Sequence, residues 1–325
     1  MFFTRNSGKR SWILFFRFLL LAIAIIFFTN IALENKETIE LAWRSIRYVN
    51  LLLSTLLSLG GFFLFPVCIW QLFQGRFQKC PSKNFISIQI CYHISNFYKY
   101  IPGKISTLLV MIDEAGKQGV DRMALFHAWV GNYGLSILIG MCLAFFVIFP
   151  FFDSVSYSKF LSIPVFILMF LAVIPTTNMW LMKALLIFLK RDVSSLVPFS
   201  CSTLLKAFAI QLVAWLLLGL SFAIIADIYL PLDAEKFFFL TLGYPVAHTA
   251  GFLVMIAPAG LGVREGVLVA ILMQCVQRNG DQTTLDIFLF IVIVHRMVIT
   301  LTDSLLLFIA YGVRHCRCGK KMMSD

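Results

Sequence analysis

The residues best suited to chemistry lie around a break in an apolar stretch, at positions 257–266. Pro258 cannot continue a helix, and Gly260 and Gly262 allow unusual backbone dihedrals and close backbone approach. We expect one helix to end at this break and another to begin near Val263. The N–H groups and the positive dipole end of the new helix would then be available to an anion.

Two charged residues follow this break directly. Arg264 would join the helix N-terminus in an anion site, and Glu265 would act as its countercharge or as a proton carrier. The alternative is a structural helix break at which Arg264 and Glu265 only pair with each other. Charges inside a membrane are costly and usually functional, so we favour a role in binding.

A second break lies at 96–104, where Pro102 and Gly103 form a turn between Lys99 and Lys104. Two amphipathic tyrosines lie beside Lys99, and a lipid phosphate would suit both lysines. The alternative is that the lysines extend to the headgroups on the cytoplasmic side. We favour the binding role for Lys104, and both interpretations stay open for Lys99.

The last apolar segment carries a third set of polar residues. Arg296, Thr300 and Asp303 stand at positions i, i+4 and i+7, so they share one face of a helix. Either Arg296 and Asp303 neutralise each other and serve as structural glue, or they face a cavity near Arg264 and Glu265. The spacing alone does not decide between these interpretations.

Motifs that mark common catalytic and cofactor sites are absent from the sequence. There is no phosphate-binding loop, no HExxH, no GxSxG and no GxGxxG placed after a strand. The eight cysteines are scattered without a disulfide pattern, and the single histidines in apolar segments are best explained by packing. We therefore expect no enzyme activity, no cofactor and no metal.

The composition indicates which fold must position these residues. Of the 325 residues, 60% are hydrophobic and 13% are charged, which is about half the charged fraction of a soluble domain. Such a chain cannot cover a surface that faces water, so its main solvent must be lipid. We expect an all-α fold, a polytopic bundle of transmembrane helices with about eight spans.

The net charge of +11 reflects topology rather than nucleic-acid binding, because the basic residues form short clusters between apolar runs. Positively charged loops resist translocation, so such clusters mark the cytoplasmic side. We therefore exclude nucleic acid as a partner. We place the chain in the cytoplasmic (inner) membrane with both termini in the cytoplasm.

The whole chain, 1–325, reads as a single membrane domain. Spans need about 20 apolar residues each, and the candidates are 11–33, 49–74, 123–149, 160–180, 203–229, 237–257 and 286–312. Broken hairpins are expected at 84–112 and 237–277, and a short basic tail at 313–325. Whether 237–257 crosses fully or re-enters is left open by its composition.

The charge clusters also orient the two broken hairpins. With every basic cluster in the cytoplasm, the hairpin at 84–112 opens to the cytoplasm and the one at 237–277 opens to the outside. Many transporters build a midplane binding site from inverted pairs of interrupted segments. We therefore predict an inverted repeat with a polar site between its halves.

The two breaks together resemble a known family. The string 100–104 (YIPGK), the later string 258–266 (PAGLGVREG) and Arg296 in the last span are similar in order and spacing to the lysylphosphatidylglycerol synthase transmembrane region family, whose members are also called flippase-like domain proteins. The likeness covers nearly the whole chain, although Ala259 separates the proline from the glycine. It implies a membrane domain that moves a lipid across the bilayer.

In fused members of that family, a soluble aminoacyl-transferring domain follows the membrane domain. This chain ends at Asp325, so the resemblance implies the flippase-like half alone. The expected partner is a membrane lipid or a lipid-linked saccharide of cell-envelope biogenesis, and the oligomeric state is open. The rival functions are an accessory or scaffold of envelope glycosyltransferases, and a transferase that uses polyprenyl phosphate.

Overall fold

The computed structural model describes residues 47–75, 83–100, 105–148, 198–230, 232–254, 260–276 and 282–322. Within these ranges it contains eight α-helices, one short 3₁₀ helix and no strand, in agreement with the expected all-α fold. The predicted spans 11–33 and 160–180 lie outside the described residues. The total of about eight spans therefore stays a prediction.

Four helices of the described part are long and apolar enough to cross a membrane. They are α3 (Tyr48–Gln74), α6 (Arg122–Ile148), α9 (Cys201–Tyr229) and α12 (Gln282–Met322). They cover the segments in which the sequence predicts spans at 49–74, 123–149, 203–229 and 286–312. By length and composition, the chain is thus consistent with a helical membrane protein.

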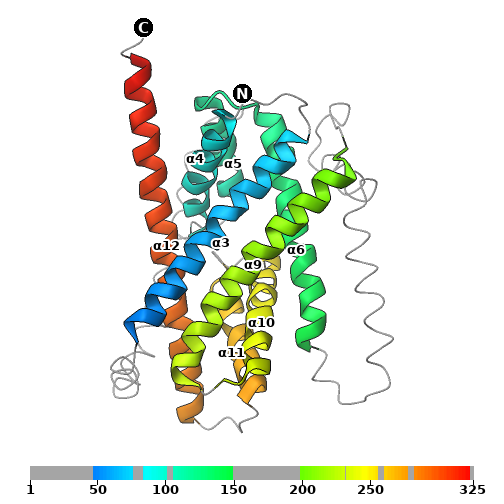
Figure 1. The fold of residues 1–325 in the computed structure, drawn as a ribbon, viewed down its shortest axis with the longest axis vertical. Helices are drawn as coiled ribbons and strands as arrows, with labels where there is room; N and C mark the ends of the chain where they lie inside the picture. Colours follow the sequence, from blue (N-terminus) through cyan, green and yellow to red (C-terminus); the bar gives the residue numbers. More distant parts are fainter. Residues whose placement is uncertain are drawn as a thin grey trace, which may run out of the picture.

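Helix α12 is longer than a single span requires. Its 41 residues measure about 60 Å, roughly twice the thickness of the hydrocarbon core of a bilayer. Residues 313–322 of the expected tail continue this helix, and its C-terminal part projects beyond the other labelled helices in Figure 1.

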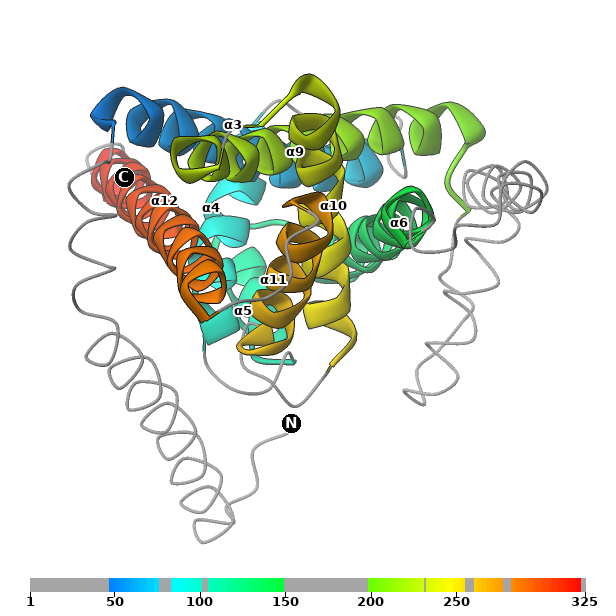
Figure 2. The same cartoon turned by 90° about the horizontal axis from the view of Figure 1, so that it is seen from below.

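Helices α3 and α9 lie side by side and form one layer, with the other helices beneath it and with α12 and α6 on the two flanks (Figures 1 and 2). Small and polar side chains bring the two backbones close. The hydroxyls of Ser54 and Ser58 each lie 2.7 Å from the hydroxyl of Ser221. A Cβ atom at Gly61 would lie 2.8 Å from Leu218, so only glycine fits there without displacing Leu218.

The first broken hairpin, called hairpin A here, consists of α4 (Lys83–Phe97), η1 (Tyr98–Tyr100) and α5 (Ile105–Lys117). At its open end, Arg317 donates to Ser87 over 3.2 Å and Arg314 pairs with Glu114 at 3.0 Å. At its tip, the amide of Asn96 donates to Asp303 over 2.9 Å. Hairpin A therefore lies along the C-terminal half of α12.

The second broken hairpin, hairpin B, consists of α10 (Ala234–Leu253) and α11 (Val263–Val276). The thiol of Cys275 donates to the carbonyl of Lys236 over 3.8 Å at its open end, and α12 begins only six positions after α11 ends. Hairpin B thus opens near the N-terminal end of α12. In Figure 1 the two hairpins occupy opposite halves of the molecule, with α4 and α5 above and α10 and α11 below.

The break in hairpin B has the backbone that its glycines allow. Gly260 and Gly262 have φ values of 71° and 83°, in the left-handed region that favours glycine. A Cβ atom at Gly260 would lie 2.9 Å from the Cα atom of Gly251, so the two chain segments touch through their backbones. Helix α11 begins at Val263, where the sequence predicts a restart.

Candidate functional site

The tips of both hairpins line a cavity of about 110 Å³ near the middle of α12. Every described helix contributes at least one lining residue to it. A cavity needs about 10–15 Å³ to hold one ordered water, so this cavity has room for a group of several heavy atoms. The cavity therefore depends on all of the described helices.

Helix α12 supplies two of the predicted site residues, Arg296 and Asp303. Arg296 pairs with Glu265 of hairpin B at 3.0 Å, and Asp303 pairs with Lys99 of hairpin A at 2.7 Å. Arg296 lines the cavity, whereas Asp303 is not among the lining residues, and the two do not pair with each other. Each α12 charge contacts a hairpin tip.

Glu265 connects three groups at the start of α11. One carboxylate oxygen accepts from the Gly262 amide over 2.8 Å, which is the Glu half of the capping box that often starts a helix. The other oxygen lies 3.0 Å from Arg296 and 3.5 Å from Arg264. The Gly262 amide, which the sequence assigns to an anionic ligand, is thus already used by the chain's own carboxylate.

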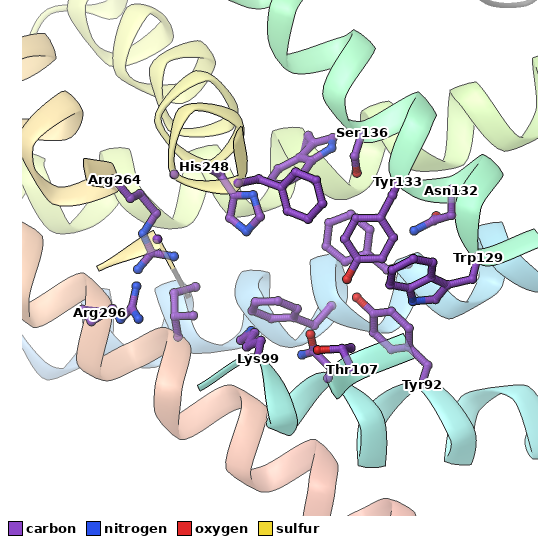
Figure 3. Close-up of a pocket in the computed structure, with 18 residues that line it drawn as sticks. Tyr92, Lys99, Thr107, Trp129, Asn132, Tyr133, Ser136, His248, Arg264 and Arg296 are labelled. Carbon is purple, nitrogen blue, oxygen red and sulfur yellow. The ribbon is translucent and has the colours of Figure 1, made fainter. Parts of the chain in front are cut away.

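Lys99 lies at the tip of hairpin A and points into the cavity (Figure 3). Its ammonium contacts Asp303 and also lies 4.8 Å from the centre of the Phe62 ring, a distance suited to a cation–π contact. This position differs from the interpretation in which Lys99 extends to the headgroups. The structure brings Lys99 together with Arg264, Glu265, Arg296 and Asp303.

The charges of this group do not cancel. Among the described residues it holds three cations, Lys99, Arg264 and Arg296, and two carboxylates, Glu265 and Asp303. All three cations line the cavity. In surroundings of low dielectric, where charges interact strongly, the balance favours an anionic group such as a phosphate.

The other end of the cavity is neutral and aromatic. In Figure 3, Trp129 and Asn132 lie at the opposite end from Arg264 and Arg296, and the hydroxyl of Tyr133 points toward the centre. The rings of Trp129 and Tyr133 have centroids 4.2 Å apart, and Phe252 stacks on Tyr133 at 5.1 Å. The cavity therefore joins a cationic end to an aromatic end.

Sequence reasoning missed this aromatic end. Its signal lies in α6, where polar and aromatic residues recur at helical spacing and thus share one face: Trp129, Asn132, Tyr133 and Ser136. His248, which the sequence assigns to packing, also lines the cavity and contacts Trp215, with the ring centroids 4.7 Å apart and the rings tilted by 59°.

Four predicted residues lie outside the described residues. They are Pro102, Gly103, Lys104 and Pro258. Within the described ranges, no group of three or more His, Cys, Asp or Glu side chains is placed to hold a metal ion.

Comparisons of this chain with protein-family models, with curated proteins and with solved structures found no match. The resemblance to the flippase-like family therefore stays a prediction. Function is determined by the residues of the site rather than by the fold.

Proposed function

We propose that this chain is a flippase-like membrane protein that moves a lipid headgroup across the cytoplasmic membrane in cell-envelope biogenesis. One observation carries the proposal: two hairpins that open at opposite ends of α12 meet at one cavity lined by three cations, which pair with two carboxylates. A headgroup with a phosphate would bind among the cations while its acyl or prenyl chain stays in lipid.

The proposal gives each hairpin a side of the membrane. The open end of hairpin A lies against Arg314 and Arg317, and basic residues at a helix end favour the cytoplasmic side. Hairpin B then opens to the outside, and the two hairpins form the halves of an inverted repeat. In this arrangement a headgroup reaches the cavity from one side by displacement of one hairpin and leaves by displacement of the other.

We assign to Arg264 the role of binding the phosphate of the headgroup. This arginine lies at the start of α11, lines the cavity and is buried, so a hydrogen bond to an anion there would be made in low dielectric. A transferase that uses polyprenyl phosphate is the weaker rival, because a reacting centre needs positioned acid and base groups, whereas the carboxylates here are engaged with cations.

The test is transport of fluorescent lipids by the purified chain in liposomes. Wild type should move a phosphate-bearing lipid between leaflets, and Arg264→Gln should slow this at least tenfold, because one charge-assisted hydrogen bond contributes about 1.5–3 kcal/mol. Arg264→Lys, which keeps the charge, should recover part of the rate. Lys206→Gln is the matched control, since Lys206 is exposed on α9 and does not line the cavity.

Equal transport by wild type and Arg264→Gln would contradict the proposal. Absence of transport by wild type, with every variant retaining wild-type function in the cell, would favour a scaffold for envelope glycosyltransferases. Thermal unfolding of each variant shows whether a lost rate reflects a lost fold.

A further inference from the structure

The aromatic end of the cavity contains hydrogen-bonding atoms that find no partner within the described residues. They are the indole nitrogens of Trp129 and Trp215 and the amide oxygen of Asn132. All three residues line the cavity, and Asn132 and Trp215 are each only 2% exposed. A buried polar atom without a partner is costly, so such atoms in a cavity indicate a ligand that supplies the missing bonds.

From these atoms we infer that the headgroup is a glycosyl phosphate, in which a sugar ring is joined through phosphate to the lipid. The inference rests on the proposed function and specifies its substrate. The phosphate lies at the cationic end with Arg264 and Arg296, and the sugar lies at the aromatic end with Trp129 and Asn132 and reaches Trp215, which lines the same cavity.

The hydrogen-bonding character of the aromatic end selects a hydroxylated group. Each indole N–H needs an acceptor, and the Asn132 oxygen needs a donor. A sugar hydroxyl does both, because its oxygen accepts and its hydrogen donates. A quaternary ammonium or a protonated amine offers no acceptor to an indole N–H, although aromatic rings alone would attract such a cation.

The charge and shape of the cavity support the same choice. Three cations line it, and they repel a positively charged headgroup. The neighbouring rings of Trp129, Tyr133 and Phe252 present flat apolar faces. The C–H face of a sugar ring packs well on such faces, whereas glycerol is short and flexible and has no comparable face.

Binding measurements on the full chain in detergent micelles test the inference. Isothermal titration calorimetry would compare farnesyl phosphoglucose with farnesyl phosphate, which lacks the sugar, and with glucose 1-phosphate, which lacks the lipid. Short-chain phosphatidylglycerol and phosphatidylcholine represent a flexible polyol and a cation. Farnesyl phosphoglucose should bind at least tenfold more tightly than each of the other four.

Substitutions in the aromatic end should remove only the sugar's contribution. Asn132→Leu and Trp129→Phe should each weaken the binding of farnesyl phosphoglucose about fivefold, which is the effect of one neutral hydrogen bond. The binding of farnesyl phosphate should stay unchanged. Gln274→Leu and Trp70→Phe are matched controls, because each also removes a buried polar atom that lacks a partner within the described residues but lies outside the cavity lining. Both controls should bind as wild type does.

The outcomes separate the two proposals. Equal binding of farnesyl phosphoglucose and farnesyl phosphate, with no effect of Asn132→Leu, would overturn the sugar site and leave the phosphate site in place. Tighter binding of phosphatidylcholine or phosphatidylglycerol would overturn the sugar assignment. Binding of glucose 1-phosphate as tight as that of farnesyl phosphoglucose would overturn the inference that the sugar phosphate is attached to a lipid. If Arg264→Gln bound every phosphate-bearing ligand as tightly as wild type does, this result would count against the proposed function itself.

Discussion

Hairpins A and B both contact α12 near its middle, but they supply opposite members of the ion pairs. Hairpin A brings the cation Lys99 to Asp303, whereas hairpin B brings the carboxylate Glu265 to Arg296. Helix α12 therefore offers a negative group to one hairpin and a positive group to the other. Neither hairpin can replace the other in its contact with α12.

The two contacts also differ in how firmly they are held. The side chain of Glu265 is 8% exposed and also accepts from the Gly262 amide within its own turn. The side chain of Lys99 is 24% exposed and opens onto the cavity. Water screens the Lys99 pair more, so hairpin A should separate from α12 at a lower free energy than hairpin B.

The largest expected effect is that of Glu265→Ala. The change removes the negative charge that both arginines contact and the cap on Gly262, so the free energy of unfolding should fall by about 3–5 kcal/mol. Unfolding in mixed micelles with increasing dodecyl sulfate measures it. Glu235→Ala, at an exposed position in the first turn of α10, should change the value by no more than about 0.5 kcal/mol. A similar effect of both variants would show that Glu265 does not anchor hairpin B.

Lys99→Met should have a smaller effect, about 2–3 kcal/mol, because Asn96 still donates to Asp303. The double variant Lys99→Met/Asp303→Asn removes both charges and should recover at least half of this loss. The same micelle titration applies. Lys117→Met breaks an exposed pair with Asp113 and a pair with buried Glu114, which Arg314 still contacts, so it should cost less than about 1 kcal/mol. A double variant as unstable as the sum of its single changes would contradict direct pairing.

Substitution of two glycines should have the smallest effect on stability, and it compares the packing of the two hairpins directly. A Cβ atom at Gly219 would collide with the backbone carbonyl of Thr241 in hairpin B, so Gly219→Ala should cost about 1 kcal/mol after the gain in helix propensity. The atoms nearest to a Cβ atom at Gly116 of hairpin A belong to the flexible Arg122 side chain. Gly116→Ala should therefore raise stability by about 0.5 kcal/mol. Equal shifts in unfolding temperature for the two variants would show that hairpin B is not fixed by backbone contact.

Within the described residues, four long apolar helices lie where the sequence predicts spans, because length and apolar composition determine such helices locally. The restart of α11 at Val263 follows from the glycines before it. The partners of Arg296 and Asp303 do not follow from the sequence. Seven residues separate the two along a helix by about 10 Å, too far for a direct pair, and the partners come from hairpins distant in the chain.

The aromatic end escaped prediction for a different physical reason. Asn132 and Trp129 lie in an apolar span, where isolated polar side chains usually bond across to neighbouring helices. Only the tertiary arrangement shows that the Asn132 oxygen faces a cavity instead of a partner. A polar stripe at helical spacing is a signal, but its meaning depends on what lies opposite.

The pairing of both hairpins with α12 has a consequence for the order of synthesis. Asn96 and Asp303 are 207 positions apart in the chain, and Arg296 follows Glu265 by 31. While α12 is still on the ribosome, the charged tips of both hairpins lack these counterions, and burial of a charge in lipid is costly. The tips should therefore remain at the membrane surface until α12 emerges. Insertion of α12 would then draw both hairpins inward, so the cavity forms only once α12 is in place.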